Sequence, residues 1–198
     1  MEDGTNEFIK NPYPWNKEAS IIYLESPAGV GFSICGKQDE CSFTDDSSAD
    51  DNLIAVLNLM IMKFPELQDN DLYLSGESYA GIYVPYLAQR IHKFITDAKH
   101  KGSKDYIPNF KGFMIGNGVT DWRFDTTPAL FEMSQMHGII PLEQYTFMKQ
   151  NCTDTDGNFN ENLSQKCYGA ASRFYDLLES INIYDVYGKC YKEGDSKF

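Results

Sequence analysis

A single serine between two apolar segments is the residue of this sequence best suited to chemistry. It is Ser78, in the stretch DLYLSGESYAGIY at residues 71–83. Gly76 and Ala80 lie two positions before and after it, where a tight strand-to-helix turn needs small side chains. In such a turn, the nucleophile elbow, the hydroxyl projects beyond the strand and the N–H of the next residue, Tyr79, points at a developing oxyanion. The pattern predicts a serine nucleophile.

The same residues also fit an ordinary helix start. Serine is a favoured N-cap residue, and Glu77 suits the positive end of a helix dipole. The strict elbow pattern has glycine where Ala80 stands. The short pattern leaves both interpretations open, so the surrounding sequence must decide between them.

The segments around Ser78 alternate between strand and helix patterns. Short apolar runs predict strands, and longer runs with apolar spacings of three and four predict helices. In chain order these segments are 20–25, 47–64, 72–74, 79–100 and 110–115. Pro85 lies inside the second helical segment and predicts a kink there or a helix that begins near it. The alternating order predicts a parallel sheet with helices on its faces.

The pattern changes after about residue 127, where helical segments dominate. They cover 127–137, 141–150 and 164–180. We therefore predict two parts. Residues 1–126 would form a partial α/β core that carries the elbow, and residues 127–198 would form a mostly helical insertion.

Composition narrows the class of protein. The 198 residues include 42% hydrophobic ones, which favours a folded domain, and the formal net charge is −12. A nucleic acid or an anionic membrane surface would meet repulsion. The longest apolar run, LIAVLNLMIM, has about half the length needed to span a bilayer. The charge fits an acidic protein of any compartment, or one that works at acidic pH.

Five cysteines and two glycosylation sequons favour an oxidising, secretory environment. The sequons begin at Asn151 and Asn162. No C-x-x-C pair occurs and the three histidines are scattered, so we expect no metal and no cofactor. The polar N-terminus lacks the apolar run of a signal peptide. We therefore expect that residues are missing upstream.

The sequence around the serine resembles the serine carboxypeptidase family. The similar segments follow one another in order over nearly the whole chain. They are NPYPWNKEASIIYLESPAGVGFS (11–33), FPELQDNDLYLSGESYAGIYVPYLA (64–88), NFKGFMIGNGVTD (109–121), HGII (137–140) and INIYDVYGKC (181–190).

This resemblance implies an α/β-hydrolase fold and removal of C-terminal residues from peptides at acidic pH. Ser78 would be the nucleophile, and Tyr79 would provide an oxyanion-hole N–H. Glu77 matches a family residue that binds the substrate carboxylate together with a second glutamate. Two close carboxylates share a proton, so the pair can donate a hydrogen bond to that carboxylate, and binding weakens as the pH rises. The location would be a lysosome, a vacuole or the exterior.

The other parts of a catalytic triad are not recognisable in this chain. In α/β-hydrolases an aspartate and then a histidine follow the serine. We assign neither role to His92, His100 or His137, and Glu25 stands in the wrong motif to be the second glutamate. The chain is therefore interpreted as a central fragment. It would be nearly inactive and poorly stable alone, with missing segments or a second chain supplying the aspartate and histidine.

Loop length suggests one of the disulfides. The five residues between Cys35 and Cys41 would close an easy loop. Cys152 with Cys167 is the second predicted pair, which leaves Cys190 for a partner elsewhere. Cys167 with Cys190 stays open as an alternative.

Other functions also stay open. An esterase or acyltransferase could use the same scaffold, although carboxylate recognition by Glu77 favours a peptidase. A non-catalytic truncated paralogue is the third possibility. For the peptidase, the expected partners are peptides or proteins with a free C-terminus.

Overall fold

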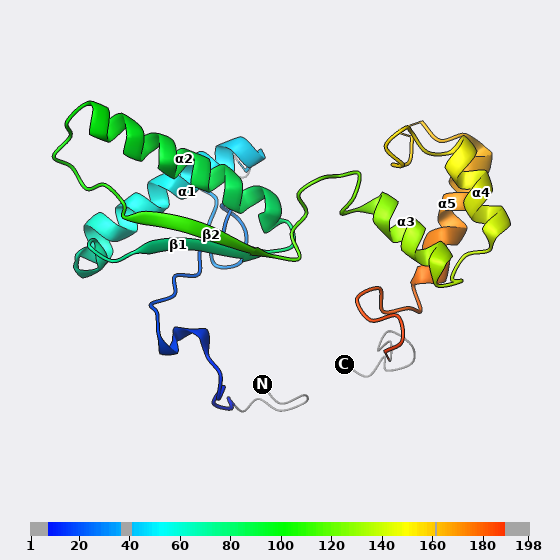
Figure 1. Cartoon of the computed structure of the whole chain (residues 1–198), viewed down its shortest axis with the longest axis horizontal. Helices are drawn as coiled ribbons and strands as arrows, with labels where there is room; N and C mark the ends of the chain where they lie inside the picture. Colours follow the sequence, from blue (N-terminus) through cyan, green and yellow to red (C-terminus); the bar gives the residue numbers. More distant parts are fainter. Residues whose placement is uncertain (1–7, 37–40, 161, 189–198) are drawn as a thin grey trace.

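The part of the chain that carries Ser78 is built on a parallel pair of strands. The computed structural model describes residues 8–36, 41–160 and 162–188. Strand β1 (Leu72–Glu77) pairs in parallel with β2 (Phe110–Gly116). Helix α2 (Ala80–His100) connects them and packs against both (Figure 1). This parallel strand–helix–strand unit confirms the predicted α/β class.

Helix α1 (Asp45–Asn58) packs alongside α2 (Figure 1). Its start is fixed by a capping box, because the Thr44 side chain accepts from the Ser47 N–H and Ser47 Oγ accepts from the Thr44 N–H. Arg90 of α2 then pairs with two carboxylates of α1, those of Asp46 and Asp50. The predicted helix at 47–64 therefore starts two residues earlier and is tied to α2.

The predicted helix at 47–64 does not stay α-helical to its end. A π-helical turn, η3 (Leu59–Lys63), follows α1, and a 3₁₀ turn, η4 (Pro65–Leu67), follows η3. An earlier 3₁₀ turn, η1, covers Trp15–Lys17. Pro65 has no N–H to extend the helix and disfavours a helical backbone at Phe64, so the helical run ends there.

Helix α2 supplies much of the packing in this part of the chain. Ile91 is fully buried, and Val84, Leu87 and Ala88 are nearly so. The helix begins at Ala80 and passes through Pro85. A late helix start near Pro85, one of the two alternatives, is therefore wrong.

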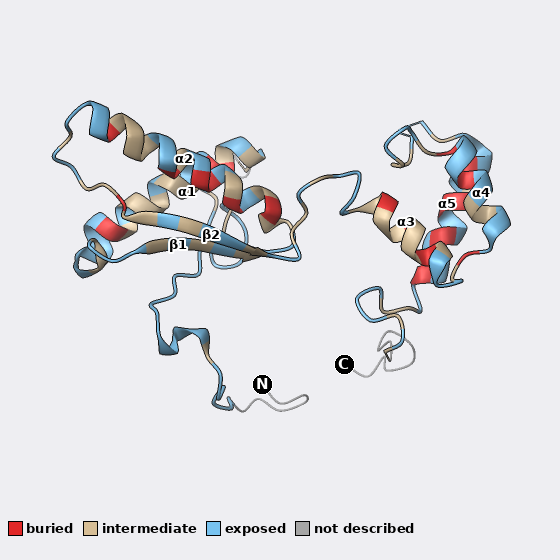
Figure 2. Cartoon of the chain, in the orientation of Figure 1, coloured by how far each residue is buried: buried red, intermediate tan, exposed pale blue. Residues whose placement is uncertain are grey.

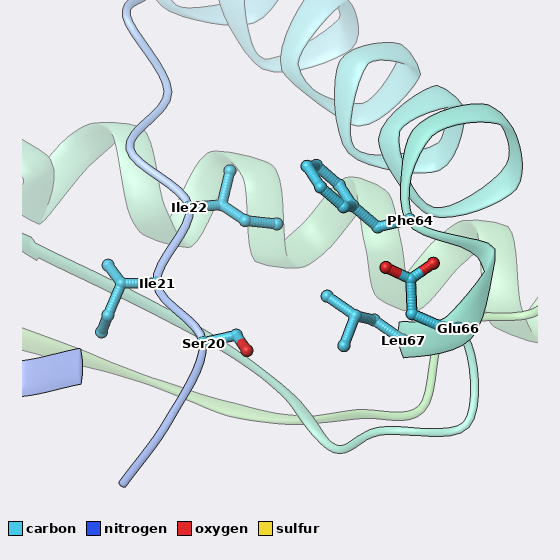
Figure 3. Close-up of a pocket in the computed structure, with 6 residues that line it drawn as sticks. All are labelled: Ser20, Ile21, Ile22, Phe64, Glu66 and Leu67. Carbon is cyan, nitrogen blue, oxygen red and sulfur yellow. The ribbon is translucent and has the colours of Figure 1, made fainter. Parts of the chain in front are cut away.

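The predicted strand at residues 20–25 is wrong. No strand occurs there among the described residues, and Tyr23 is 78% exposed. Ile21 and Ile22 instead line a shallow pocket with Phe64 and Leu67 (Figure 3). An apolar run shows that side chains can be buried, but a strand also needs backbone partners on a neighbouring strand. Within the described residues the sheet has β1 and β2 alone.

Three helices follow β2 and share a core of their own. They are α3 (Thr127–Met136), α4 (Leu142–Asn151) and α5 (Gln165–Leu178), as predicted to within two residues at each end. Phe131, Ile140, Met148 and Phe174 are buried among them. Figure 2 shows this buried face, and Figure 1 shows the three helices grouped apart from the sheet. The division at residue 126 into two parts remains a prediction.

The structure contains both predicted disulfides. Cys35 is bonded to Cys41, and Cys152 is bonded to Cys167 inside the core of α3–α5. The alternative pair of Cys167 with Cys190 is therefore wrong. Cys190 itself lies outside the described residues. No helix in the described part of the chain combines the length and apolarity that crossing a bilayer requires.

Replacing Phe174 by alanine should destabilise the group of α3–α5 by about 3–5 kcal/mol, because a fully buried ring leaves a cavity. Hydrogen exchange of the α5 amides, followed by mass spectrometry, would measure the loss. Tyr168→Ala on the same helix is the control, since Tyr168 is 69% exposed and should change exchange little. Equal protection in both variants would contradict the buried role of Phe174.

Candidate active site

The backbone at Ser78 has the conformation that a nucleophile elbow requires. Ser78 is exposed and stands between the end of β1 and the start of α2, with a φ of 61°. Positive φ is uncommon for residues other than glycine and is often a sign of function. The Ser78 N–H donates to the carbonyl of Gly116, at 3.1 Å, which ties the turn to the end of β2.

Two further hydrogen bonds hold this conformation. The Ser78 carbonyl accepts from the Gly81 N–H at 3.0 Å and from the Val119 N–H at 2.9 Å. The first bond belongs to the helix start, and the second comes from the loop after β2. The turn is therefore held by its own helix, by β2 and by the following loop.

The small residues of the pattern are in contact, as the elbow requires. A Cβ on Gly76 would lie 2.4 Å from the Ala80 Cβ and 3.1 Å from the Val84 Cγ2. Gly81 has a role that the sequence pattern did not reveal. A Cβ there would lie 2.2 Å from the carbonyl oxygen of Val119. The loop at Val119 can pass this close to α2 only because Gly81 has no side chain.

The loop that follows β2 wraps the elbow from the other side. Asn117 has a φ of 42°, and a Cβ on Gly118 would lie 3.3 Å from the Gly81 Cα. The GNG motif at 116–118 is a sequence signal from which such a turn could have been predicted. Further along, Asp125 Oδ2 accepts from the N–H groups of Thr120 and Asp121, at 2.8 and 2.9 Å. The hydrogen bond from the Thr120 N–H, followed by that from the Asp121 N–H, lowers the pKa of Asp125.

An ion pair closes the same loop. Arg123 Nη2 lies 2.8 Å from Asp121 Oδ2. The hydrogen bond from the Arg123 side chain, followed by that from the Arg123 backbone N–H, lowers the pKa of Asp121 to about 2. A carboxyl with a lowered pKa stabilises the fold above its unfolded pKa, and this contribution is lost as the pH falls through about 2. The pair beside the elbow therefore stays ionised at moderately acidic pH.

Tyr79 presents both a backbone donor and an anchored side chain. Among the described residues nothing accepts a hydrogen bond from its N–H, which precedes the first turn of α2. Its phenol oxygen lies 3.3 Å from Asp45 Oδ2 and 3.4 Å from Asp45 Oδ1. The N–H is thus available to an anion at the positive end of a helix. The contact with Asp45 was not predicted, because 34 residues separate the two.

Glu77 is the last residue of β1, is exposed, and lies opposite Gly116 in the sheet register. Its carboxylate makes no hydrogen bond or ion pair within the described ranges. Glu25, in contrast, uses its carboxylate locally, where it accepts from the Phe32 N–H. The structure places Glu77 next to Ser78 and leaves its role in substrate binding a prediction.

The histidines are placed away from the elbow or engaged elsewhere. His92 lies about 18 Å along α2 from the helix start, at 1.5 Å of rise per residue. His100 is the last residue of α2. His137 follows α3, where its Nδ1 lies 2.9 Å from the Met133 carbonyl oxygen and its ring packs near Tyr187. None of these positions suggests a base for Ser78.

Both predicted glycosylation residues are exposed. Asn151 ends α4, and its Nδ2 donates to the carbonyl of Phe147 at 2.8 Å. Asn162 lies in the turn before α5, two residues before the N-cap Ser164. Their modification remains a prediction.

Comparison with known proteins adds to this geometry. The family model described as serine carboxypeptidase matches residues 1–197. "Serine carboxypeptidase-like 35" of Arabidopsis thaliana is 37% identical over 188 residues, which are 94% of this chain and 38% of that protein. "Serine carboxypeptidase 1" of Hordeum vulgare is 39% identical over 181 residues, or 91% of this chain and 34% of that protein.

Among solved structures, a similar one is that of Kex1(delta)p, a prohormone-processing carboxypeptidase from Saccharomyces cerevisiae. It is 20% identical, with a TM-score of 0.49, and the match covers 80% of this chain and 35% of that one. The chain thus spans a little over a third of the length of the relatives that it matches.

Proposed function

Since this chain belongs to the serine carboxypeptidase family, as the match over residues 1–197 shows, we propose that it carries the nucleophile of a serine-type carboxypeptidase. The observation that supports this most is the backbone of Ser78. An exposed serine with a φ of 61°, between a parallel strand and the helix that follows it, has the geometry of an elbow. An N-cap serine needs no such conformation, since N-caps are ordinarily extended.

The proposed reaction is acyl transfer to Ser78. Its Oγ attacks the carbonyl carbon of the last peptide bond while its proton passes to a base. The oxyanion that forms is stabilised by the Tyr79 N–H, and the C–N bond then breaks as the base gives the proton to the departing nitrogen, which releases the C-terminal amino acid. Water hydrolyses the ester on Ser78 and restores the hydroxyl. We propose that the base and its aspartate come from polypeptide outside these 198 residues.

Glu77 is proposed to bind the C-terminal carboxylate of the substrate. A carboxylate can receive a hydrogen bond only from a protonated donor, so this contact requires Glu77 or a neighbouring carboxyl to carry a proton. Binding should then weaken as the pH rises from acidic to neutral. The preferred pH of the reaction would be acidic for this reason.

Replacing Glu77 by glutamine should remove most of that pH dependence. The amide N–H₂ donates a hydrogen bond at every pH, so KM for a peptide should change little between acidic and neutral solution, while KM of the unmodified protein should rise. Glu66→Gln is the control, since Glu66 is exposed in η4, before β1 begins, whereas Glu77 ends that strand beside Ser78. A KM of the Glu77→Gln variant that still rises with pH, as in the control, would contradict the role of Glu77.

The function itself is tested by comparing a peptide that has a free C-terminus with its C-terminal amide, at acidic and neutral pH. The longest protein that the transcript encodes should be used, beside the 198-residue chain. Release of the last residue from the free acid alone, best at acidic pH, is the expected result. Turnover of a neutral ester and of neither peptide would indicate an esterase or acyltransferase. No turnover in either protein would favour a non-catalytic role.

We further propose a secretory location, in a lysosome or vacuole or outside the cell. Two disulfides and two exposed sequon asparagines support it, because both features suit oxidising compartments. The proposed partners are peptide or protein substrates alone, with no nucleic acid and no membrane.

A further inference from the structure

The starts of α1 and α2 meet at the side chain of Tyr79. Its phenol donates a hydrogen bond shared by both carboxylate oxygens of Asp45, the first residue of α1, at 3.3 and 3.4 Å. Asp45 is itself fixed, because the capping box of Thr44 and Ser47 sets the first turn of α1. The contact thus joins two rigid helix ends across 34 residues of sequence.

The Tyr79 ring is held on further sides. Its centroid lies 4.8 Å from that of Tyr83, one turn along α2, and 6.2 Å from that of Trp122 in the loop after β2. Burial, followed by the nearby Asp45 carboxylate, raises the pKa of the Tyr79 phenol. The phenol therefore keeps its proton and stays a donor to Asp45 at every pH at which the protein would work.

This anchoring matters because Tyr79 also carries the backbone N–H beside Ser78. The direction of that N–H depends on the backbone torsions between Ser78 and Tyr79, and Ser78 is in a strained region. An oxyanion-hole donor must lie within about 2.7–3.1 Å of the oxyanion to be effective. A side chain fixed at its far end resists rotation of the peptide that bears the donor.

We infer that Asp45 is a positioning residue, which acts through the Tyr79 phenol to hold the Tyr79 N–H in place for the transition state. This inference rests on the proposed function, since it concerns the same acyl transfer. Asp46 and Asp50 have a different task, because they pair with Arg90 further along α2. The stabilisation of a helix start by acidic residues does not explain why Asp45 contacts a tyrosine of another helix.

The test is a pair of single variants, Asp45→Ala and Tyr79→Phe, together with the double variant, in the longest protein that the transcript encodes. Each single variant should lower kcat about tenfold with KM unchanged, a part of the hundredfold or greater loss that follows removal of an oxyanion donor. Affinity for a peptide aldehyde, which forms a hemiacetal with the serine, should fall by the same factor. The double variant should lose no more than either single one, since both remove one contact.

Asp51→Ala is the matched control. Asp51 lies on α1 and is exposed, and it has no hydrogen bond or ion pair within the described ranges, so its removal should leave kcat unchanged. Additive losses in the double variant, or a rise in KM with unchanged kcat, would overturn the inference and leave the proposed function intact. A protein whose activity does not depend on Ser78 would overturn both.

Discussion

In the longest protein that the transcript encodes, replacing Ser78 by alanine should reduce peptide turnover about a millionfold, to the level left by binding and the remaining oxyanion donors. The variant removes one oxygen atom and keeps the backbone at Gly76–Gly81, because alanine and serine tolerate positive φ about equally poorly. The measurement is release of the C-terminal amino acid, followed by covalent labelling with a fluorophosphonate and mapping of the labelled peptide. The label should be on Ser78 in the unmodified protein and absent from the variant.

Ser75→Ala provides the comparison for this result. Ser75 is also exposed on β1, three residues earlier, and its hydroxyl has no partner among the described residues. Its loss should leave both turnover and labelling unchanged. Labelling that persists in the Ser78→Ala protein, or that shifts to another serine, would show that the elbow is a structural turn and not a nucleophile.

Replacing Gly81 by alanine should damage both folding and activity. The new methyl group would lie 2.2 Å from the Val119 carbonyl oxygen and 2.7 Å from the Val119 carbon and nitrogen. These are backbone atoms, and the Val119 N–H donates a hydrogen bond to the Ser78 carbonyl. The loop therefore cannot move away without disturbing the elbow. Overpacking of this kind costs about 1–3 kcal/mol. Hydrogen exchange in β1, α2 and the loop after β2 should rise, and turnover should fall.

Gly112→Ala separates this collision from the general effect of adding a methyl group. Gly112 lies in β2, and its added Cβ would meet no atom within 4 Å. This variant should be neutral or slightly stabilising, because alanine restricts the unfolded chain more than glycine does. Equal exchange in the Gly81→Ala and unmodified proteins would contradict the close approach of α2 and the loop.

Local sequence was sufficient for most of the elements around the site. The spacing of apolar residues predicted the ends of α2 and β2 to within a residue or two. This works because the buried side chains of a helix or strand recur with the period of that element. The elbow was predicted from Gly76 and Ala80, since its steric rule acts within five residues. The strand predicted at residues 20–25 was wrong because a strand needs hydrogen-bonding partners on a neighbouring strand. Periodicity does not show whether such a strand is present.

Contacts between distant residues explain what the sequence did not show. Asp45 precedes the helix predicted at 47–64, and only the packing of α1 on α2 brings it to Tyr79. Gly81 lies just beyond the elbow pattern, and its role depends on the path of Val119. The pair of Cys152 with Cys167 was predicted with Cys167–Cys190 left open, and its burial beside Phe131 and Phe174 was not predicted.

The conformation of Ser78 also lowers the stability of the fold. A left-handed residue that is not glycine costs about 1–2 kcal/mol relative to one that adopts this region freely. Glycine in place of Ser78 would make the turn more stable but would remove the nucleophilic hydroxyl. The serine is therefore a compromise in which local stability is lower than the backbone would allow, and selection for thermal resistance alone would act against the hydroxyl.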